Sequence, residues 1–273
     1  MPINPLVLAP STIPNSAPLD YIEAAARAGY QWIGLRLNAS PGLPYHPVVG
    51  DAALIRAMKQ AIAAAGLTVL DIYSFYLVPD VKVEDFVPAF DLAAELGAKY
   101  AVTMGADTDW SRMRENFERL CDLAAGRNLV CAIEPAVIRP LASMPQTLKL
   151  IAEAKRTNAA ICVDPLNFVR AGDTAADLAQ VDPALLPYAQ ITDGMILPGE
   201  PDPAMLGRMP PNQRRLMGEG MVPVADILDA LPPGLPLSVE FPPPNAATDE
   251  RAWAALVHGN ARAWLDRYYA RQR

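Results

Sequence analysis

The sequence is short of basic residues and lacks long apolar runs. Lysine and arginine together number 23 against 30 acidic residues in 273, which gives a formal net charge of −7. General nucleic-acid binders carry a basic surplus or a basic stripe, so we expect no DNA or RNA partner. No run of about 18 apolar residues occurs, which predicts no membrane span. The first residues also lack the basic start and apolar stretch of a signal peptide.

Paired cysteines and nucleotide-binding glycine motifs are missing as well. Cys121, Cys131 and Cys162 are odd in number and far apart in sequence, so we expect buried free thiols. Free thiols are typical of a reducing compartment, which predicts a cytoplasmic protein. No GxGxxG or GxxxxGK[ST] motif follows the first apolar run, which argues against a nucleotide-binding open sheet.

Short apolar runs alternate with amphipathic helical stretches along the whole sequence. Strand-like runs lie at 7–11, 32–37, 68–73, 100–104, 130–135, 159–164, 188–193 and 235–241. Helical patterns lie at 19–29, 51–65, 83–96, 109–125, 145–156, 174–180 and 249–269. Parallel strands need helical crossovers, and eight such units favour one closed (β/α)₈ TIM barrel domain over residues 1–273. An open doubly wound sheet is the alternative.

One long loop, at about 195–222, interrupts this alternation after the seventh predicted strand. It is rich in proline, glycine, methionine and arginine. Loops of this length inside a compact domain are more often functional than idle, so we expect it to border the site.

Acidic side chains end several predicted strands. Glu134, Asp164 and Glu240 each follow an apolar run, and Gln190 and Asp193 belong to the seventh strand. Chemistry in such barrels lies at the carboxyl ends of the strands, where these side chains would converge. Buried carboxylates are costly unless paired or bound to a cation, and carboxylate and amide oxygens suit Mg²⁺ or Mn²⁺. The alternative is that each acid caps the next helix or pairs with an arginine.

Five short motifs are spread over the chain: AIEP around Glu134, VDPLNFVRAGD at 163–173, YAQITDG at 188–194, GEG at 218–220 and SVEFP around Glu240. Together they resemble the xylose-isomerase-like TIM barrels, a superfamily of sugar-phosphate isomerases and epimerases. The resemblance implies one divalent metal ion held by Glu134, Asp164, Gln190 and Glu240. Mn²⁺ or Mg²⁺ is expected, with Co²⁺ or Zn²⁺ as further options. The presence of only two histidines excludes the three-zinc endonuclease IV branch.

The resemblance also implies an activity. We expect an isomerase or epimerase that acts on a small sugar-like or polyol-ketone substrate through a metal-stabilised enediolate, with Glu134 and Glu240 as acid and base. Asn167 and Gln190 stand where many relatives have histidine. The glutamine form resembles inosose dehydratase and 3-dehydroshikimate dehydratase, so a metal-dependent lyase is one alternative. A non-catalytic metabolite-binding relative is the other.

Further polar residues are predicted to surround the metal. The expected substrate contacts are Arg36, His46, Tyr73, Arg139, Arg170, Arg215 and Glu219. Arginine binds carboxylate or phosphate with paired hydrogen bonds. An anionic polyhydroxylated substrate is therefore one option beside a neutral one. The alternatives are that the arginines neutralise the rim acids and that His46 only packs its loop. We expect Asn167 and Asp193 to orient the metal ligands from behind. The sequence leaves open whether the protein forms a homo-oligomer.

Overall fold

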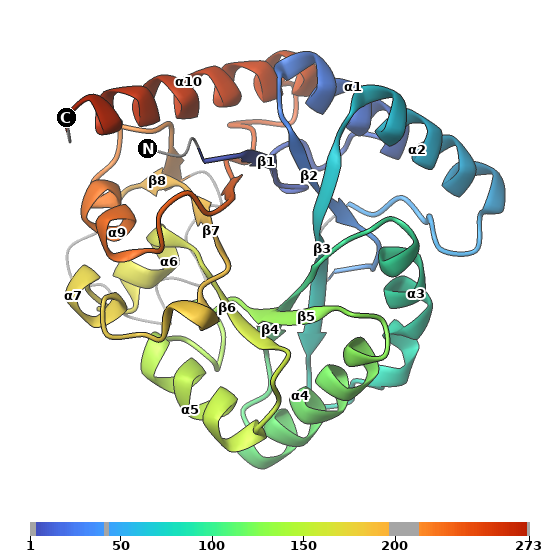
Figure 1. The fold of residues 1–273 in the computed structure, drawn as a ribbon, viewed down its shortest axis with the longest axis vertical. Coiled ribbons are helices and arrows are strands. Elements are labelled where there is room, and N and C mark those ends of the chain that lie inside the picture. Colours follow the sequence, from blue (N-terminus) through green and yellow to red (C-terminus); the bar gives the residue numbers. More distant parts are fainter. Residues whose placement is uncertain (1–3, 41–43, 197–212, 272–273) are drawn as a thin grey trace.

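Eight parallel strands close into a barrel (Figure 1). The computed structural model describes residues 4–40, 44–196 and 213–271. The barrel strands are Leu6–Leu8 (β1), Trp32–Arg36 (β2), Thr68–Leu77 (β3), Tyr100–Gly105 (β4), Val130–Ile133 (β5), Ala159–Val163 (β6), Tyr188–Ile191 (β7) and Leu237–Val239 (β10). They follow one another around the barrel in chain order, and β10 pairs with β1 to close it. The predicted TIM barrel is confirmed.

Helices form a ring outside the strands (Figure 1). They are Pro18–Ala28 (α1), Ala52–Ala65 (α2), Val83–Phe86 (η1), Val87–Glu95 (α3), Trp110–Ala125 (α4), Met144–Ala154 (α5), Pro165–Arg170 (α6), Ala175–Leu178 (α7), Pro183–Leu185 (η2), Val224–Ala230 (α9) and Glu250–Arg271 (α10). Glycine ends α1 and α2, with Gly29 and Gly66 in the left-handed conformation. None of the described helices is long and apolar enough to cross a membrane.

Apolar side chains form two layers. One fills the barrel: Val7, Leu70, Tyr73, Val102, Ala132, Cys162 and Tyr188. The other, much larger layer lies between the strands and the helices. Removing this apolar surface from water is the main driving force for folding, and it fixes the strand ends that carry the site. All three cysteines are buried free thiols, as predicted.

The structure differs from the sequence prediction mainly around the long loop. Asp193–Gly194 (β8) and Arg214–Arg215 (β9) pair as a small antiparallel sheet, which joins the two ends of the loop. Residues 197–212 of the predicted loop lie outside the described residues. The strand β3 also continues past its predicted end at Tyr73 to Leu77, and α6 was not predicted.

A carboxylic acid, Asp71 of β3, is fully buried beside the barrel-filling side chains. Its Oδ1 occupies the place that a Cβ on Gly34 would need, so only glycine fits opposite it. The phenols of Tyr73 and Tyr188 lie near, but neither Asp71 oxygen makes a well-formed hydrogen bond to a described residue. Burial raises the pKa of Asp71 to about 7, and the Tyr188 hydroxyl opposes that rise.

We therefore expect Asp71 to make the fold less stable as the pH rises. Folded Asp71 keeps its proton up to about pH 7, whereas the unfolded chain loses it near 3.8. Between these values the folded state binds more protons, so the free energy of unfolding falls as pH rises. This single group removes roughly 3 kcal/mol between pH 5 and pH 8. In urea unfolding, the free energy of unfolding of Asp71→Asn should therefore fall less between pH 5 and pH 8 than that of the wild type, by the same amount. The exposed Asp80→Asn is the matched control, and equal profiles for wild type and Asp71→Asn would contradict the prediction.

Candidate metal and substrate site

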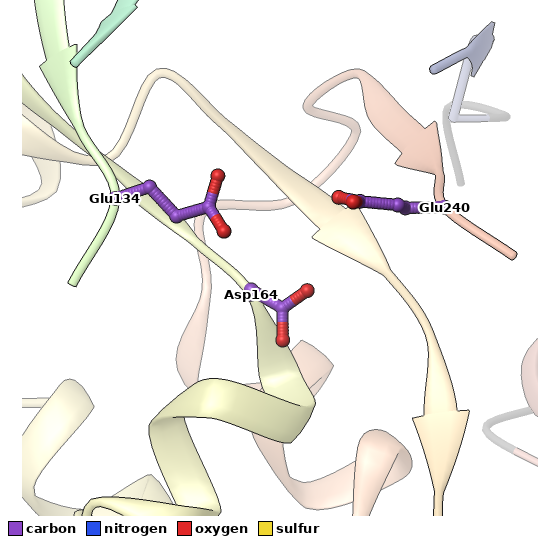
Figure 2. Close-up of side chains that lie close together, drawn as sticks. All are labelled: Glu134, Asp164 and Glu240. Atoms are coloured by element: carbon purple, nitrogen blue, oxygen red, sulfur yellow. The ribbon is translucent and has the colours of Figure 1, made fainter. Parts of the chain in front are cut away.

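Three carboxylates meet at the carboxyl ends of the barrel strands. Glu134 follows β5, Asp164 follows β6 and caps α6, and Glu240 follows β10. Figure 2 shows the three side chains pointing toward one another. One oxygen from each lies within 4.8 Å of the others, a geometry that fits a shared metal ion. The convergence predicted from the strand ends is what the structure shows.

Two amide side chains hold the Glu134 carboxylate. Asn167 Nδ2 donates to Glu134 Oε1 at 3.3 Å, and Gln190 Nε2 donates to Glu134 Oε2 at 3.0 Å. Gln190 Nε2 also donates to the Tyr73 hydroxyl at 3.4 Å. The fully buried Gln190 therefore turns its N–H toward Glu134, and its carbonyl Oε1 has no partner among the described residues. Asn167 therefore contacts a predicted metal ligand, and its role in orienting that ligand stays a prediction.

Arg214 of β9 reaches into the acidic cluster. Its Nη1 donates to Asp164 Oδ2 at 2.7 Å and to Thr192 Oγ1 at 2.9 Å. Its Nη2 lies 3.8 Å from Glu240 Oε1, and only 14% of the side chain is exposed. The sequence prediction selected the neighbouring Arg215 instead. Arg215 is exposed and donates from Nη1 to the Arg214 carbonyl at 3.1 Å.

Burial and mutual repulsion shape the acidity of the cluster. Burial raises the pKa of Glu134 well above its usual value, and the charges of Glu240 and Asp164 raise it further. Burial also raises the pKa of Glu240, while Arg214 opposes both shifts. Burial alone would lower the pKa of Arg214, but Asp164 and Glu240 raise it. A cation is thus strongly favoured among these acids.

Asp193 anchors the segment that carries Arg214. Its two carboxylate oxygens accept four backbone N–H groups, from Gly194 at 2.8 Å, Gly218 at 3.0 Å, Gly220 at 3.0 Å and Val222 at 3.1 Å. A Cβ on Gly220 would collide with this carboxylate, which explains the second glycine of the GEG motif. Asp193 thus holds in place the segment that carries Arg214. The sequence prediction for Asp193 was that it orients the metal ligands.

Three of the predicted substrate residues lie near this cluster. Tyr73 lies inside the barrel and contacts Gln190 through its hydroxyl. Arg36 ends β2 and is partly buried. Glu219 is exposed and lines a hollow together with Arg214. Contact of these three residues with a substrate stays a prediction.

Three further predicted contacts, His46, Arg139 and Arg170, have partners other than the three acids. His46 is exposed, lies 3.1 Å through Nε2 from the Asn15 carbonyl, and lines a hollow with Arg36. Arg139 lies over the Tyr76 ring, 5.0 Å from its centre. Arg170 Nη2 donates to the Met195 carbonyl at 2.8 Å and to Gln213 Oε1 at 3.1 Å. Arg170 therefore connects α6 to both stems of the long loop.

Two residues that shape the site are missing from the predicted contacts. Arg215 was selected in place of its neighbour Arg214, although adjacent residues of a strand face opposite sides and only one could reach the acids. Thr192, whose hydroxyl accepts from Arg214, carries no signal in the sequence. The pairing of β8 with β9, which brings Arg214 beside Thr192, spans residues 195–213 and follows no local pattern.

Comparison with known proteins identifies the family. The sequence profile of the xylose isomerase-like TIM barrel family matches residues 22–257. This protein belongs to that family, as the motifs around the three acids predicted. A search of curated protein sequences found no match.

Solved structures share the fold at low sequence identity. The IOLI protein with a binding zinc atom superposes with a TM-score of 0.76 at 18% identity, over 97% of this chain and 98% of that one. A probable 3-DHS dehydratase, AsbF from Bacillus anthracis, gives 0.71 at 13% identity over 94% and 98%. An L-ribulose 3-epimerase gives 0.71 at 16% identity over 99% and 97%. The shared barrel thus carries more than one chemistry.

Proposed function

We propose that this protein is a divalent-metal-dependent isomerase or epimerase of a small sugar-like or polyol-ketone substrate. The observation that carries the proposal is the meeting of Glu134, Asp164 and Glu240 within 4.8 Å at the mouth of the barrel. When all three are ionised, Arg214 compensates one charge and two negative charges remain. A divalent cation would neutralise that excess.

The chemistry of the available atoms fits such an ion. Glu240 Oε2 and Gln190 Oε1 are buried and have no hydrogen-bond partner among the described residues. Carboxylate and amide oxygens suit Mn²⁺ or Mg²⁺, while the zinc atom bound to the IOLI protein supports Zn²⁺ or Co²⁺ as further options. We propose Glu134, Asp164, Glu240 and Gln190 as the ligands, the last after a rotation of its amide.

The side chains around the cluster suit proton transfer at carbon. A bound divalent ion would polarise a substrate carbonyl and acidify the neighbouring C–H. Glu134 and Glu240 would remove and return the proton as general base and general acid. Asn167 fixes the Glu134 carboxylate, and neither the Asn167 nor the Gln190 amide can exchange protons itself.

A dehydratase is the second candidate. It is favoured by the amide of Gln190 beside Glu134, where many epimerase relatives have histidine, and by the likeness to AsbF. Both reactions would begin with removal of the same proton and differ in whether a hydroxyl leaves. We further propose a single-domain cytoplasmic protein, which the buried free thiols support.

Metal analysis followed by a product assay tests the proposal. The purified protein should contain, or take up on titration, one equivalent of Mn²⁺, Mg²⁺, Co²⁺ or Zn²⁺, and a chelator should abolish its activity. Incubation with a panel of polyol ketones should then give a new sugar without enone absorbance. Enone absorbance would favour the dehydratase. A protein that takes up no divalent ion would leave only a metabolite-binding relative.

A further inference from the structure

Two arginines at the barrel mouth carry buried N–H groups for which the described part of the chain offers no acceptor. Arg36 is the last residue of β2, and Arg139 lies between β5 and α5. Arg36 Nη1 and Arg139 Nε are both buried, and neither has a hydrogen-bond partner among the described residues. A buried charged donor without an acceptor is costly, so native structures rarely leave one unexplained. An acceptor that comes from outside the chain would satisfy both groups.

One of the two guanidinium groups, that of Arg139, lies over an aromatic ring, that of Tyr76 in β3. The Arg139 guanidinium is 5.0 Å from the centre of the ring. Burial raises the pKa of the Tyr76 phenol, the Arg139 and Arg36 charges lower it, and the Glu134 charge raises it. The charges of the two arginines and of Glu134 therefore all act on the same phenol. We call Arg36, Tyr76 and Arg139 the arginine corner.

The acids of the cluster are already matched by other cations. Arg214 is the arginine in direct contact with them, at 2.7 Å from Asp164, and a divalent ion would neutralise the rest. Burial lowers the pKa of Arg36, and the charge of Glu240 only partly offsets this effect. With the metal site filled, the arginine corner would keep its positive charge. This charge faces the same barrel mouth as the three acids.

We infer that the substrate carries an anionic oxygen group, a carboxylate or a phosphate, which Arg36 and Arg139 bind while its hydroxyl and carbonyl groups lie over the three acids. This inference rests on the proposed function and names its substrate class: a polyhydroxylated acid or a sugar phosphate, in place of a neutral sugar. Guanidinium groups match both oxyanions with paired, charge-assisted hydrogen bonds. The Tyr76 ring would hold the Arg139 fork in place by a cation–π contact.

Calorimetric titration with three matched six-carbon probes tests this. The probes are D-glucitol, which is neutral, D-gluconate, which adds a carboxylate, and D-glucitol 6-phosphate. Each is titrated into the Mn²⁺-treated protein and into chelator-treated protein. We expect at least one anion to bind about tenfold or more tightly than glucitol, the effect of one charge-assisted hydrogen bond. The anion that gains affinity tells carboxylate from phosphate.

Variants then assign the preference to the corner. Arg36→Met and Arg139→Met should each remove most of it, whereas Arg56→Met, an exposed arginine of α2, should keep it. Lysine variants replace any methionine variant whose circular dichroism shows misfolding. Equal binding of the three probes, no binding of either anion, or a preference that survives both substitutions would overturn the inference. If the protein preferred an anionic probe but bound no Mn²⁺, the arginine corner would stand as an anion site and the metal-dependent function would be rejected.

Discussion

Glu134→Gln is expected to lose metal affinity and activity together. The substitution keeps the size of the side chain but removes a negative charge and a strong oxygen donor from the cluster that Asp164 and Glu240 complete. Replacing groups behind metal ligands costs about 10- to 100-fold in affinity, so removing a ligand should cost more than about 100-fold. Loss of a general base adds about 10²- to 10⁴-fold in rate. Titration with Mn²⁺ followed by calorimetry measures the first effect, and turnover at saturating Mn²⁺ measures the second.

A matched control for this substitution is Glu115→Gln in α4. Glu115 is exposed, and its one ion pair, with Arg114, is long at 3.9 Å, so its loss should change neither metal affinity nor turnover. If Glu134→Gln bound Mn²⁺ as tightly as wild type, the three acids would not be the metal site. If it bound weakly but turned over normally at saturating metal, Glu134 would be a ligand without a role in proton transfer.

The barrel could be predicted because its cause is local and repeated. Each strand is a short apolar run, each helix has an amphipathic pattern, and several helices end at a glycine such as Gly29 or Gly66. Parallel strands place their carboxyl ends on one rim, so the meeting of Glu134, Asp164 and Glu240 followed from their positions in sequence. No contact between distant residues had to be guessed.

The features that escaped prediction depend on long-range pairing. The two-residue strands β8 and β9 are too short to leave a periodic signal, yet they decide that Arg214 and not Arg215 enters the acidic cluster. The burial of single polar residues could not be predicted either, because a polar strand residue such as Asp71 is expected to be exposed. The irregular register of β3 between Ile72 and Phe75 likewise has no local sequence cause.

Arg214→Met should make the metal-free protein much less stable. Arg214 donates to Asp164 at 2.7 Å and is nearly buried, so its removal leaves the acids without a positive charge. Breaking one side of a buried ion pair costs about 3–5 kcal/mol. For a chain of this size we expect a fall in Tm of roughly 10 °C in the presence of a chelator. The exposed Arg56→Met, which removes the same charge from α2, should change the Tm little.

The same variant separates two explanations of how the acids are held together. If the acids form a metal site, Mn²⁺ supplies the lost positive charge, so added Mn²⁺ should raise the Tm of Arg214→Met by more degrees than it raises that of the wild type. Arg214→Lys keeps a charge but not the forked guanidinium that reaches Asp164 and Glu240. Its Tm should lie between those of the wild type and Arg214→Met. A loss of stability that is the same with and without Mn²⁺ would mean that Arg214 is the permanent counter-ion of Asp164 and Glu240. The non-catalytic relative would then be the better interpretation, because Mn²⁺ would not enter the acidic cluster even where the arginine charge is missing.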